Sequence, residues 1–333
     1  MRKKQCVLLL LPLLLSSCHS ESPSSTEPTV LPASSTLEEG EGYGFDAVDF
    51  PLEYNDYSVF QFHPIDESTC SIELVHTPLR RSLIVPSFSP EGRTVVEMAD
   101  CETHSHPTRC AQLTEIQLPS SLKKIDSAAL NFGIALQFLR VPDGVTEIQP
   151  RAFSGLDSLE ELTLPANLDQ VPELGIDLLK NLKSVYLPFH ATGIQEGALR
   201  DCVSLEEAPL PYGLKTVGAS AFEGCVSLRE VRVPKSVDLV GDSAYRGCSS
   251  LSGLTLEDGV AALGAGAFKE TALRKVFLPK SLASVGAGCF EGCPEDLVIY
   301  CEVETRPEGW DAHFDDPRDS HKVVWGAKRE DAK

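Results

Sequence analysis

The chain has 333 residues, of which 42% are hydrophobic, so it is long enough to bury a substantial core. Its formal net charge is −20 at pH 7, which argues against nucleic acid and anionic lipid headgroups as partners, because both bind through clustered Lys and Arg. Nine of the eleven cysteines follow position 18, and this odd number leaves at least one thiol outside any intramolecular disulfide.

Residues 1–17 predict an export signal. Arg2, Lys3 and Lys4 precede a short apolar segment, Val7 to Leu15, that is interrupted only by Pro12. A helix needs roughly 20 apolar residues to cross a hydrocarbon core, so this segment is too short to span a membrane. A positive start followed by a short apolar run is typical of a cleaved signal peptide.

The signal ends in Leu15-Ser16-Ser17-Cys18, which resembles the lipobox of bacterial lipoproteins. The resemblance implies cleavage before Cys18 and lipidation of its thiol and amino groups, and several acyl chains give a stable anchor. The alternative is an ordinary cleaved signal followed by a chance cysteine. The rest of residues 18–44 is rich in Ser, Pro, Thr and Glu, a composition that predicts a disordered tether because it cannot bury enough apolar surface.

Residues 45–112 include an insertion, after Val85-Pro86 and before Leu118-Pro119, with four soft or borderline ligands. These ligands are Cys101, His104, His106 and Cys110. Three interpretations stay open for the insertion. An exported protein often closes such a loop with a disulfide, here Cys101–Cys110; zinc also accepts such a ligand set; and the residues can serve neither purpose.

An internal repeat of 23 residues organises residues 113–296 into eight units. An apolar residue followed by proline recurs at this step, with Leu256-Glu257 in place of one pair and a step of 22 before the last: Leu118-Pro119, Val141-Pro142, Leu164-Pro165, Leu187-Pro188, Leu210-Pro211, Val233-Pro234 and Leu278-Pro279. In each unit, alternating apolar positions predict a short strand that the proline ends. A second extended stretch and a short helical or 3-10 turn complete the unit.

A single unit cannot be stable alone. Burying about six side chains contributes roughly 9–18 kcal/mol, whereas ordering the unit costs on the order of 35 kcal/mol. The units must therefore stack and share one core, as in solenoid proteins.

The unit from Leu228 to Leu251, LREVRVPKSVDLVGDSAYRGCSSL, resembles the repeat of the BspA-like, or treponemal-type, leucine-rich repeat family. The resemblance implies a repeat solenoid, mainly β with short helical or 3-10 turns, in a curved stack with caps at both ends. It covers residues from about 57 to 327. It assigns residues 45–112 to an N-terminal cap, with a strand pair at about 57–75 and a divergent first repeat from Ser82 to Met98. It assigns residues 297–333 to a C-terminal cap and tail in which Trp310 and Trp325 cover the last repeat. The units near Gly175 and Phe189 depart from the repeat pattern.

Four cysteines, Cys202, Cys225, Cys248 and Cys293, share one repeat position. We interpret them as buried thiols that act as small hydrophobic side chains, since redox chemistry requires an exposed thiolate in electropositive surroundings. Pairing among Cys289, Cys293 and Cys301 stays open. The sequence has no H-E-x-x-H, G-x-S-x-G or phosphate-binding glycine loop, so we expect no catalytic residues and no cofactor.

The outward side chains of the first strands form the candidate binding face. Exposed aromatic residues flanked by charge are typical of binding hot spots, although scattered apolar residues on a surface are also normal. The candidate contacts are Phe138, Arg140, Glu161, Tyr186, Glu207, Glu230, Arg232, Lys275 and Phe277.

The leading hypothesis is a non-enzymatic protein that attaches a bacterium to host matrix or plasma proteins, as the family resemblance implies. It contacts the membrane only through its lipid anchor. His19 after Cys18 does not resemble the Asp retention signal of enteric bacteria, which favours the outer membrane. One alternative is a periplasm-facing lipoprotein that scaffolds another envelope protein, and a remote one is a metal-binding protein that uses the insertion.

Overall fold

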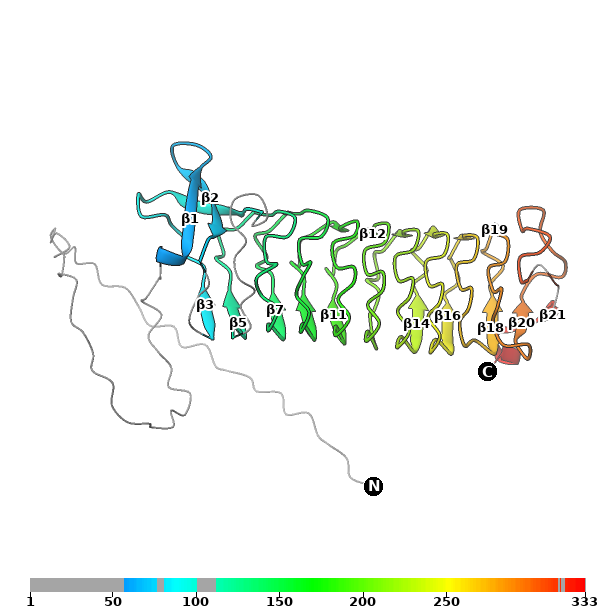
Figure 1. Cartoon of the computed structure of the whole chain (residues 1–333). Helices are drawn as coiled ribbons and strands as arrows, with labels where there is room; N and C mark the ends of the chain where they lie inside the picture. The colour runs from blue at the N-terminus through cyan, green and yellow to red at the C-terminus, as the bar shows by residue number, and fades with distance from the viewer. Residues whose placement is uncertain (1–56, 77–80, 101–111, 317, 319–320, 333) are drawn as a thin grey trace, which may run out of the picture. The chain divides into compact units, whose positions relative to one another are not determined.

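The computed structural model describes residues 57–76, 81–100, 112–316, 318 and 321–332. The signal, Cys18, the tether, and the insertion residues Cys101, His104, His106 and Cys110 lie outside the described residues. The repeat units contribute short strands to two sets that run along opposite sides of the stack, and one unit, between β11 (Ser184–Tyr186) and β14 (Glu230–Val233), contributes a strand to only one of the two sets (Figure 1). We refer to them as first strands and second strands. The expected β-solenoid with a spacing of about 23 residues is therefore confirmed.

The first strands lead each unit and pair in parallel in four groups, β3–β5, β7–β9–β11, β14–β16 and β18–β20–β21. Their bounds are β3 (Ser82–Ile84), β5 (Glu115–Gln117), β7 (Phe138–Arg140), β9 (Glu161–Thr163), β11 (Ser184–Tyr186), β14 (Glu230–Val233), β16 (Gly253–Leu256), β18 (Lys275–Leu278), β20 (Val298–Cys301) and β21 (Lys322–Trp325).

The second strands pair in parallel in two groups, and an N-terminal hairpin, β1–β2, adds antiparallel pairing to the first group. Their bounds are β1 (Phe60–Pro64), β2 (Thr69–Leu74), β4 (Thr94–Met98), β6 (Lys124–Ile125), β8 (Glu147–Ile148), β10 (Gln170–Val171), β12 (Gly193–Ile194), β13 (Thr216–Val217), β15 (Leu239–Val240), β17 (Ala262–Leu263) and β19 (Ser284–Val285). The irregular unit around Phe189 still supplies a second strand, β12.

The repeat spacing is also the pairing register. Glu230 lies opposite Gly253 and Val231 opposite Leu254, so residues 23 positions apart are neighbours across the stack. Because side chains alternate across a strand, each first strand turns its central apolar residue inward and its flanking residues outward. Strand β7 shows this pattern, with Leu139 buried between exposed Phe138 and Arg140.

Turns fill the second half of each unit, where short helices were one expectation. At Cys225 and Cys248 a backbone N–H donates to the carbonyl three residues earlier, but these bonds close single turns. Among the described residues, the helices are two short 3-10 segments, η1 (Tyr57–Val59) and η2 (Arg329–Ala332).

Every unit places one residue in the left-handed region at the same repeat position. These residues are Ala128, Arg151, Leu174, Gly197, Ser220, Ser243, Gly266 and Gly288. Their N–H groups reach the next unit, as where the Arg151 N–H donates to the Leu174 carbonyl at 2.9 Å. Stacking therefore imposes a backbone conformation that glycine adopts easily but that costs energy for leucine or arginine.

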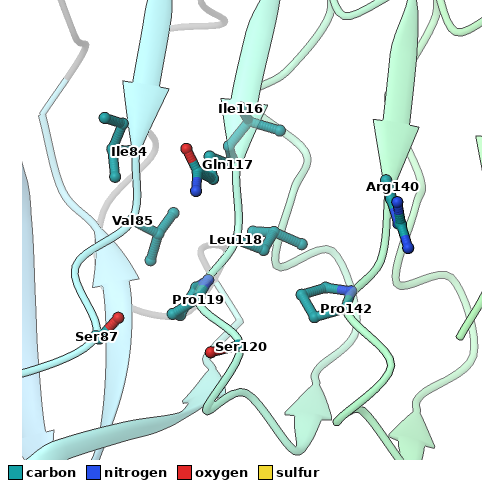
Figure 2. Close-up of a pocket in the computed structure, with 10 residues that line it drawn as sticks. All are labelled: Ile84, Val85, Ser87, Ile116, Gln117, Leu118, Pro119, Ser120, Arg140 and Pro142. Atoms are coloured by element: carbon teal, nitrogen blue, oxygen red, sulfur yellow. The ribbon is translucent and has the colours of Figure 1, made fainter. Parts of the chain in front are cut away.

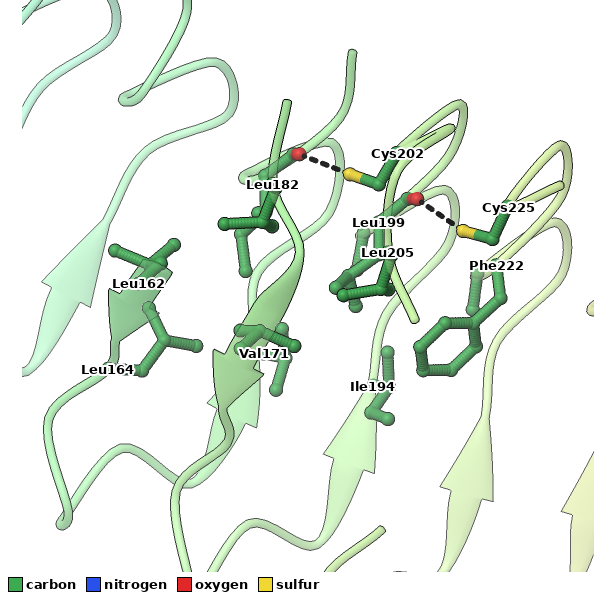
Figure 3. Close-up of a cluster of buried hydrophobic side chains, with 14 of the residues drawn as sticks. Leu162, Leu164, Val171, Leu182, Ile194, Leu199, Cys202, Leu205, Phe222 and Cys225 are labelled. Carbon is green, nitrogen blue, oxygen red and sulfur yellow. Dashed lines mark hydrogen bonds between the residues drawn. The ribbon is translucent and has the colours of Figure 1, made fainter. Parts of the chain in front are cut away.

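The core is one continuous cluster that runs through all the units. In its C-terminal half the rings of Phe222, Tyr245, Phe268 and Phe290 lie nearly parallel, with successive centroids 5.0, 5.3 and 5.9 Å apart. Figure 3 shows a neighbouring part of this core, where Leu162, Val171 and Ile194 face the interior from first and second strands. Each unit thus buries side chains only by sharing them with the units on either side.

The hydroxyl of Tyr245 lies inside this stack without a hydrogen-bond partner among the described residues, and burial raises the pKa of the phenol well above its usual value. A buried unsatisfied group costs about 1–3 kcal/mol. We therefore expect Tyr245→Phe to raise the free energy of unfolding by about 1–2 kcal/mol in urea denaturation. Tyr186→Phe, on the exposed surface, is the control and should change it by less than about 0.5 kcal/mol. A lower free energy of unfolding in Tyr245→Phe would contradict the assignment of the Tyr245 hydroxyl as buried and without a hydrogen-bond partner.

The C-terminal end of the stack is closed by aromatic residues. Trp310 is buried, and its ring centroid lies 5.3 Å from that of Phe314 and 6.1 Å from that of Trp325. The Trp310 Nε1–H donates to the Leu282 carbonyl at 3.1 Å, so its one polar group is satisfied. Trp310 also forms a parallel bridge with Val285 of β19, so this aromatic group packs against the second strand of the last repeat.

Candidate binding face

The outward side chains of the first strands lie in two columns, and two large aromatic residues stand out in them. Phe138 is 59% exposed and Tyr186 is 53% exposed. The register places Phe138 beside Glu161, which is beside Ser184 in the same column. Since these aromatic rings are solvent-exposed on rigid strands, they are available for contact with a partner.

The charged candidates differ in how they are paired. Arg140 lies 3.9 Å from Asp143 with both side chains mostly exposed, an ion pair that contributes little to stability. Arg232 lies 2.7 Å from Glu257, and this contact raises the pKa of the arginine and lowers that of the carboxyl. The charge of Arg232 is therefore compensated within the molecule.

Three glutamates of the candidate set occupy the first column. Glu207 and Glu230 are exposed and Glu161 is half-buried. None of the three forms an ion pair within the part of the chain that the structure describes. Lys275 is exposed at the start of β18. The column therefore carries uncompensated negative charge in the middle of the stack.

The expectation that Phe277 is exposed is wrong, because it is only 7% exposed. The guanidinium of Arg329, from η2, lies 4.6 Å from the centre of the Phe277 ring. The same guanidinium donates to the Leu256 carbonyl and to Asp258. The C-terminal segment thus covers this end of the face, which a local strand pattern could not reveal.

The row of first strands is interrupted between β11 and β14. Here the unit with Glu207, Ala208 and Pro209 makes only an isolated bridge, Ser184 to Glu207. Pro209 has no N–H to donate and occupies the position at which the neighbouring strands continue. The interruption therefore follows from one residue, and it leaves a gap in the ladder beside Tyr186.

Two exposed aromatic residues near this gap were not among the sequence candidates. Phe189 is 67% exposed and Tyr212 is 74% exposed. Both follow the proline that ends a unit's first strand, a position held elsewhere by polar or small residues such as Asp143, Ala166 and Lys235. An aromatic residue at a position that is otherwise polar or small was the signal that could have identified them. The sequence candidates were restricted to the first strands and did not include these turns.

A shallow hollow of about 400 Å³ lies at the N-terminal end of the face (Figure 2). Figure 2 shows Ile84, Leu118 and Pro142 along it, with Arg140 from β7 at one side. Arg140 is the one charged residue among those that line it. The hollow therefore offers apolar contact beside the side chain of Arg140.

The shared cysteine position forms a column of buried free thiols. The thiol groups of Cys202, Cys225 and Cys248 each donate to a carbonyl of the preceding unit at 3.2 Å (Figure 3 shows the first two). Burial raises the pKa of Cys202 and Cys248 to about 12. Cys289, Cys293 and Cys301 are also free and buried. The prediction of small, unreactive core side chains at this position agrees with these contacts.

We expect these thiols to resist alkylation in the native chain. With iodoacetamide at about pH 8, Cys202, Cys225 and Cys248 should stay unmodified, because only the thiolate reacts and the folded environment disfavours it. Unfolding in urea should make all three react, and peptide mass spectrometry would report each site. Native labelling of any of the three as fast as in urea would contradict the burial described above.

No group of three or more His, Cys, Asp or Glu side chains among the described residues is placed to hold a metal ion. The ligand set proposed for zinc falls outside those residues. No helix in the described part of the chain is long and apolar enough to cross a membrane.

The repeats of this chain match a known family. A family model described as the BspA type leucine rich repeat region matches residues 108–177 and 177–295 in six copies. Among solved structures, a leucine-rich repeat protein of T. pallidum has 24% identity, covering 72% of this chain and 90% of that one, with a TM-score of 0.43. A leucine rich cell surface protein of Faecalibacterium prausnitzii has 18% identity, covering 85% and 98%, with a TM-score of 0.40.

The pneumococcal vaccine antigen PcpA has 17% identity, covering 82% of this chain and 87% of that one, with a TM-score of 0.38. No curated protein matches the chain. The family model covers more than half of the 333 residues, in the region where the repeat register is regular. The chain belongs to the BspA-type leucine-rich repeat family.

Proposed function

We propose that this chain is a non-enzymatic binding protein of a bacterial cell envelope, and that the first-strand face holds a protein partner. Membership of a leucine-rich repeat family supports a protein-binding role. The observation that carries the proposal is the exposure of Phe138 and Tyr186, at 59% and 53%, on strands whose other outward residues are mostly polar. Rigid, exposed aromatic side chains supply contact area at low entropic cost.

The proposal includes the location of the protein. Residues 1–17 direct export, Cys18 carries the lipid, and residues 18–44 hold the repeats away from the membrane. Such an arrangement suits a protein of the outer membrane that attaches the cell to host matrix or plasma glycoproteins. The strong acidity of the chain fits contact with proteins rather than with lipid headgroups.

The binding test compares two double variants of the full chain against a panel of immobilised matrix and plasma glycoproteins. We expect Phe138→Ser/Tyr186→Ser to weaken binding by about tenfold or more, as for hot-spot residues. The control, Ile65→Ser/Phe88→Ser, removes two hydrophobic side chains of similar exposure, 53% and 54%, elsewhere on the surface. Binding that both variants retain equally would remove the first-strand face from the proposal.

The location test is protease digestion of the native lipoprotein on intact and permeabilised cells, with a known periplasmic protein as the control. Loss of the protein from intact cells is the expected result. Protection until the cells are permeabilised would contradict surface display and would favour the alternative, a scaffold for another envelope protein.

A further inference from the structure

The burial of Phe277 is an exception to the alternation of the first strands. Phe277 occupies the outward repeat position that Arg140, Tyr186 and Arg232 also occupy, and those three side chains are exposed. In β14 the burial alternates along the strand, whereas in β18 the last three residues are all buried. The direction of the strand therefore does not bury this ring, and a segment from outside the strand does.

The covering segment is residues 328–332, which consist of η2 and the residue before it. This segment lies against β18 and β20 (Figure 1). The guanidinium of Arg329 lies 4.6 Å from the centre of the Phe277 ring, where the aromatic face attracts a cation. The same guanidinium donates to the Leu256 carbonyl at 3.0 Å and to the carboxylate of Asp258. One side chain thus contacts both the ring and the neighbouring unit.

Arg329 makes every polar contact that joins residues 328–332 to the rest of the described chain. The other hydrogen bonds of the segment are internal. The Lys328 N–H donates to the Asp331 carboxylate at 2.7 Å, and the Asp331 N–H donates to the Lys328 carbonyl at 2.9 Å. No residue of η2 is buried. The segment is therefore a small unit of its own that a single side chain holds on the face.

The sheet beneath this segment is complete without it. Strands β18, β20 and β21 pair in parallel along their whole lengths, and the Ala327 N–H adds a hydrogen bond to the Cys301 carbonyl at 2.9 Å. The side chains of Arg329 and Asp258 are 39% and 75% exposed, and an ion pair this exposed contributes little to stability. Ala327, by contrast, is buried. The chain is therefore firmly attached up to Ala327 and weakly attached beyond it.

We propose that residues 328–332 are a displaceable cover of the first-strand face, which detaches from Phe277 while the repeats stay folded. Detachment adds the Phe277 ring to an outward surface that already presents Phe138 and Tyr186. A partner that binds this end of the face must displace Arg329, so the cover lowers the affinity of the partner by the fraction of chains in which the ring is free. The use of the ring by a partner rests on the proposed function, whereas the detachment does not.

The test measures hydroxyl-radical oxidation of single phenylalanine side chains in the full chain by peptide mass spectrometry. Phe138, 59% exposed, and Phe268, 0% exposed, are the internal references. We expect slow oxidation of Phe277, which is 7% exposed, and a several-fold increase towards the rate of Phe138 in Arg329→Ala. The matched control is Lys328→Ala, which removes a positive charge from the same segment without removing a contact to the ring, and it should leave the rate unchanged.

Two outcomes of the oxidation would overturn the inference. An unchanged rate at Phe277 in Arg329→Ala would show that this arginine does not hold the segment. A rise at both Phe277 and Phe268 would show that the segment is part of the folded core and is not a cover. These rates need no partner, so they decide the inference even where Phe138→Ser/Tyr186→Ser removes the proposed face.

Binding tests the consequence for a partner. Any glycoprotein of the panel that the native chain binds should bind Arg329→Ala several-fold more tightly, and Lys328→Ala with unchanged affinity. Equal affinities of Arg329→Ala and the native chain, with Phe277 oxidised faster, would contradict a restriction of the face by the cover.

Discussion

Phe268→Ala should lower the free energy of unfolding by about 3–5 kcal/mol, the range for deletion of a fully buried phenylalanine. The side chain is 0% exposed, and its ring stacks between Tyr245 at 5.3 Å and Phe290 at 5.9 Å. The substitution therefore opens a cavity that touches the units on both sides. Neighbouring units cannot collapse into it, because their backbones are fixed by the ladders of β15, β17 and β19.

The measurement is urea denaturation of the full chain followed by circular dichroism, with the midpoint and the slope both recorded. Phe189→Ala is the matched control, since it deletes the same atoms from a ring that is 67% exposed, and it should change the free energy of unfolding by less than about 0.5 kcal/mol. Equal losses in the two variants would mean that the ring stack does not stabilise the fold. A lower slope in Phe268→Ala alone would indicate that the units no longer unfold together.

The fold could be predicted because the repeat constrains it at several positions in each unit. An apolar residue before proline, another two residues earlier and a third seven residues later recur in register, and stacking converts that register into two parallel ladders. The buried cysteine column followed from the same logic. Cys202, Cys225 and Cys248 share one repeat position, and a repeat position that is buried in one unit is buried in the units stacked on it.

The left-handed column could not be predicted from residue types. Glycine occupies three of its eight positions, whereas Arg151, Leu174 and Ser220 occupy others with φ of 61°, 47° and 53°. At each of these positions the backbone N–H donates to a carbonyl of the next unit, whatever the residue type. The stacked neighbour, and not the local sequence, selects the conformation.

The candidate face was only partly predictable for a related reason. Alternation along a strand predicts which side chains point outward, and Phe138, Tyr186, Glu207 and Glu230 are exposed as expected. It does not predict what covers them from elsewhere, and Arg329 lies 52 residues after Phe277. Phe189 and Tyr212 were missed because they lie in turns, where no period-two pattern applies.

Gly241→Ala should lower the free energy of unfolding by about 1–3 kcal/mol, the cost of adding one methyl group to a tightly packed site. A Cβ at this position would lie 2.7 Å from the backbone nitrogen of Ala219 and 2.8 Å from the carbonyl carbon of Gly218. Both contacts are with the backbone of the preceding unit, so no side chain can rotate away. Gly264 and Gly286 show the same close approach at their own repeat positions.

Gly213→Ala is the opposite case and should raise the free energy of unfolding by about 0.4–1 kcal/mol. A Cβ there meets no atom within 4 Å, and the residue is outside the left-handed region, so alanine only reduces the freedom of the unfolded chain. Urea denaturation of both variants measures the two signs in one experiment. Two changes of the same sign would show that unit-to-unit contact does not determine which residues this repeat accepts, since glycine and alanine differ by a single methyl group. Opposite signs would establish that the C-terminal units are held at a separation that only glycine permits at the repeat position of Gly241.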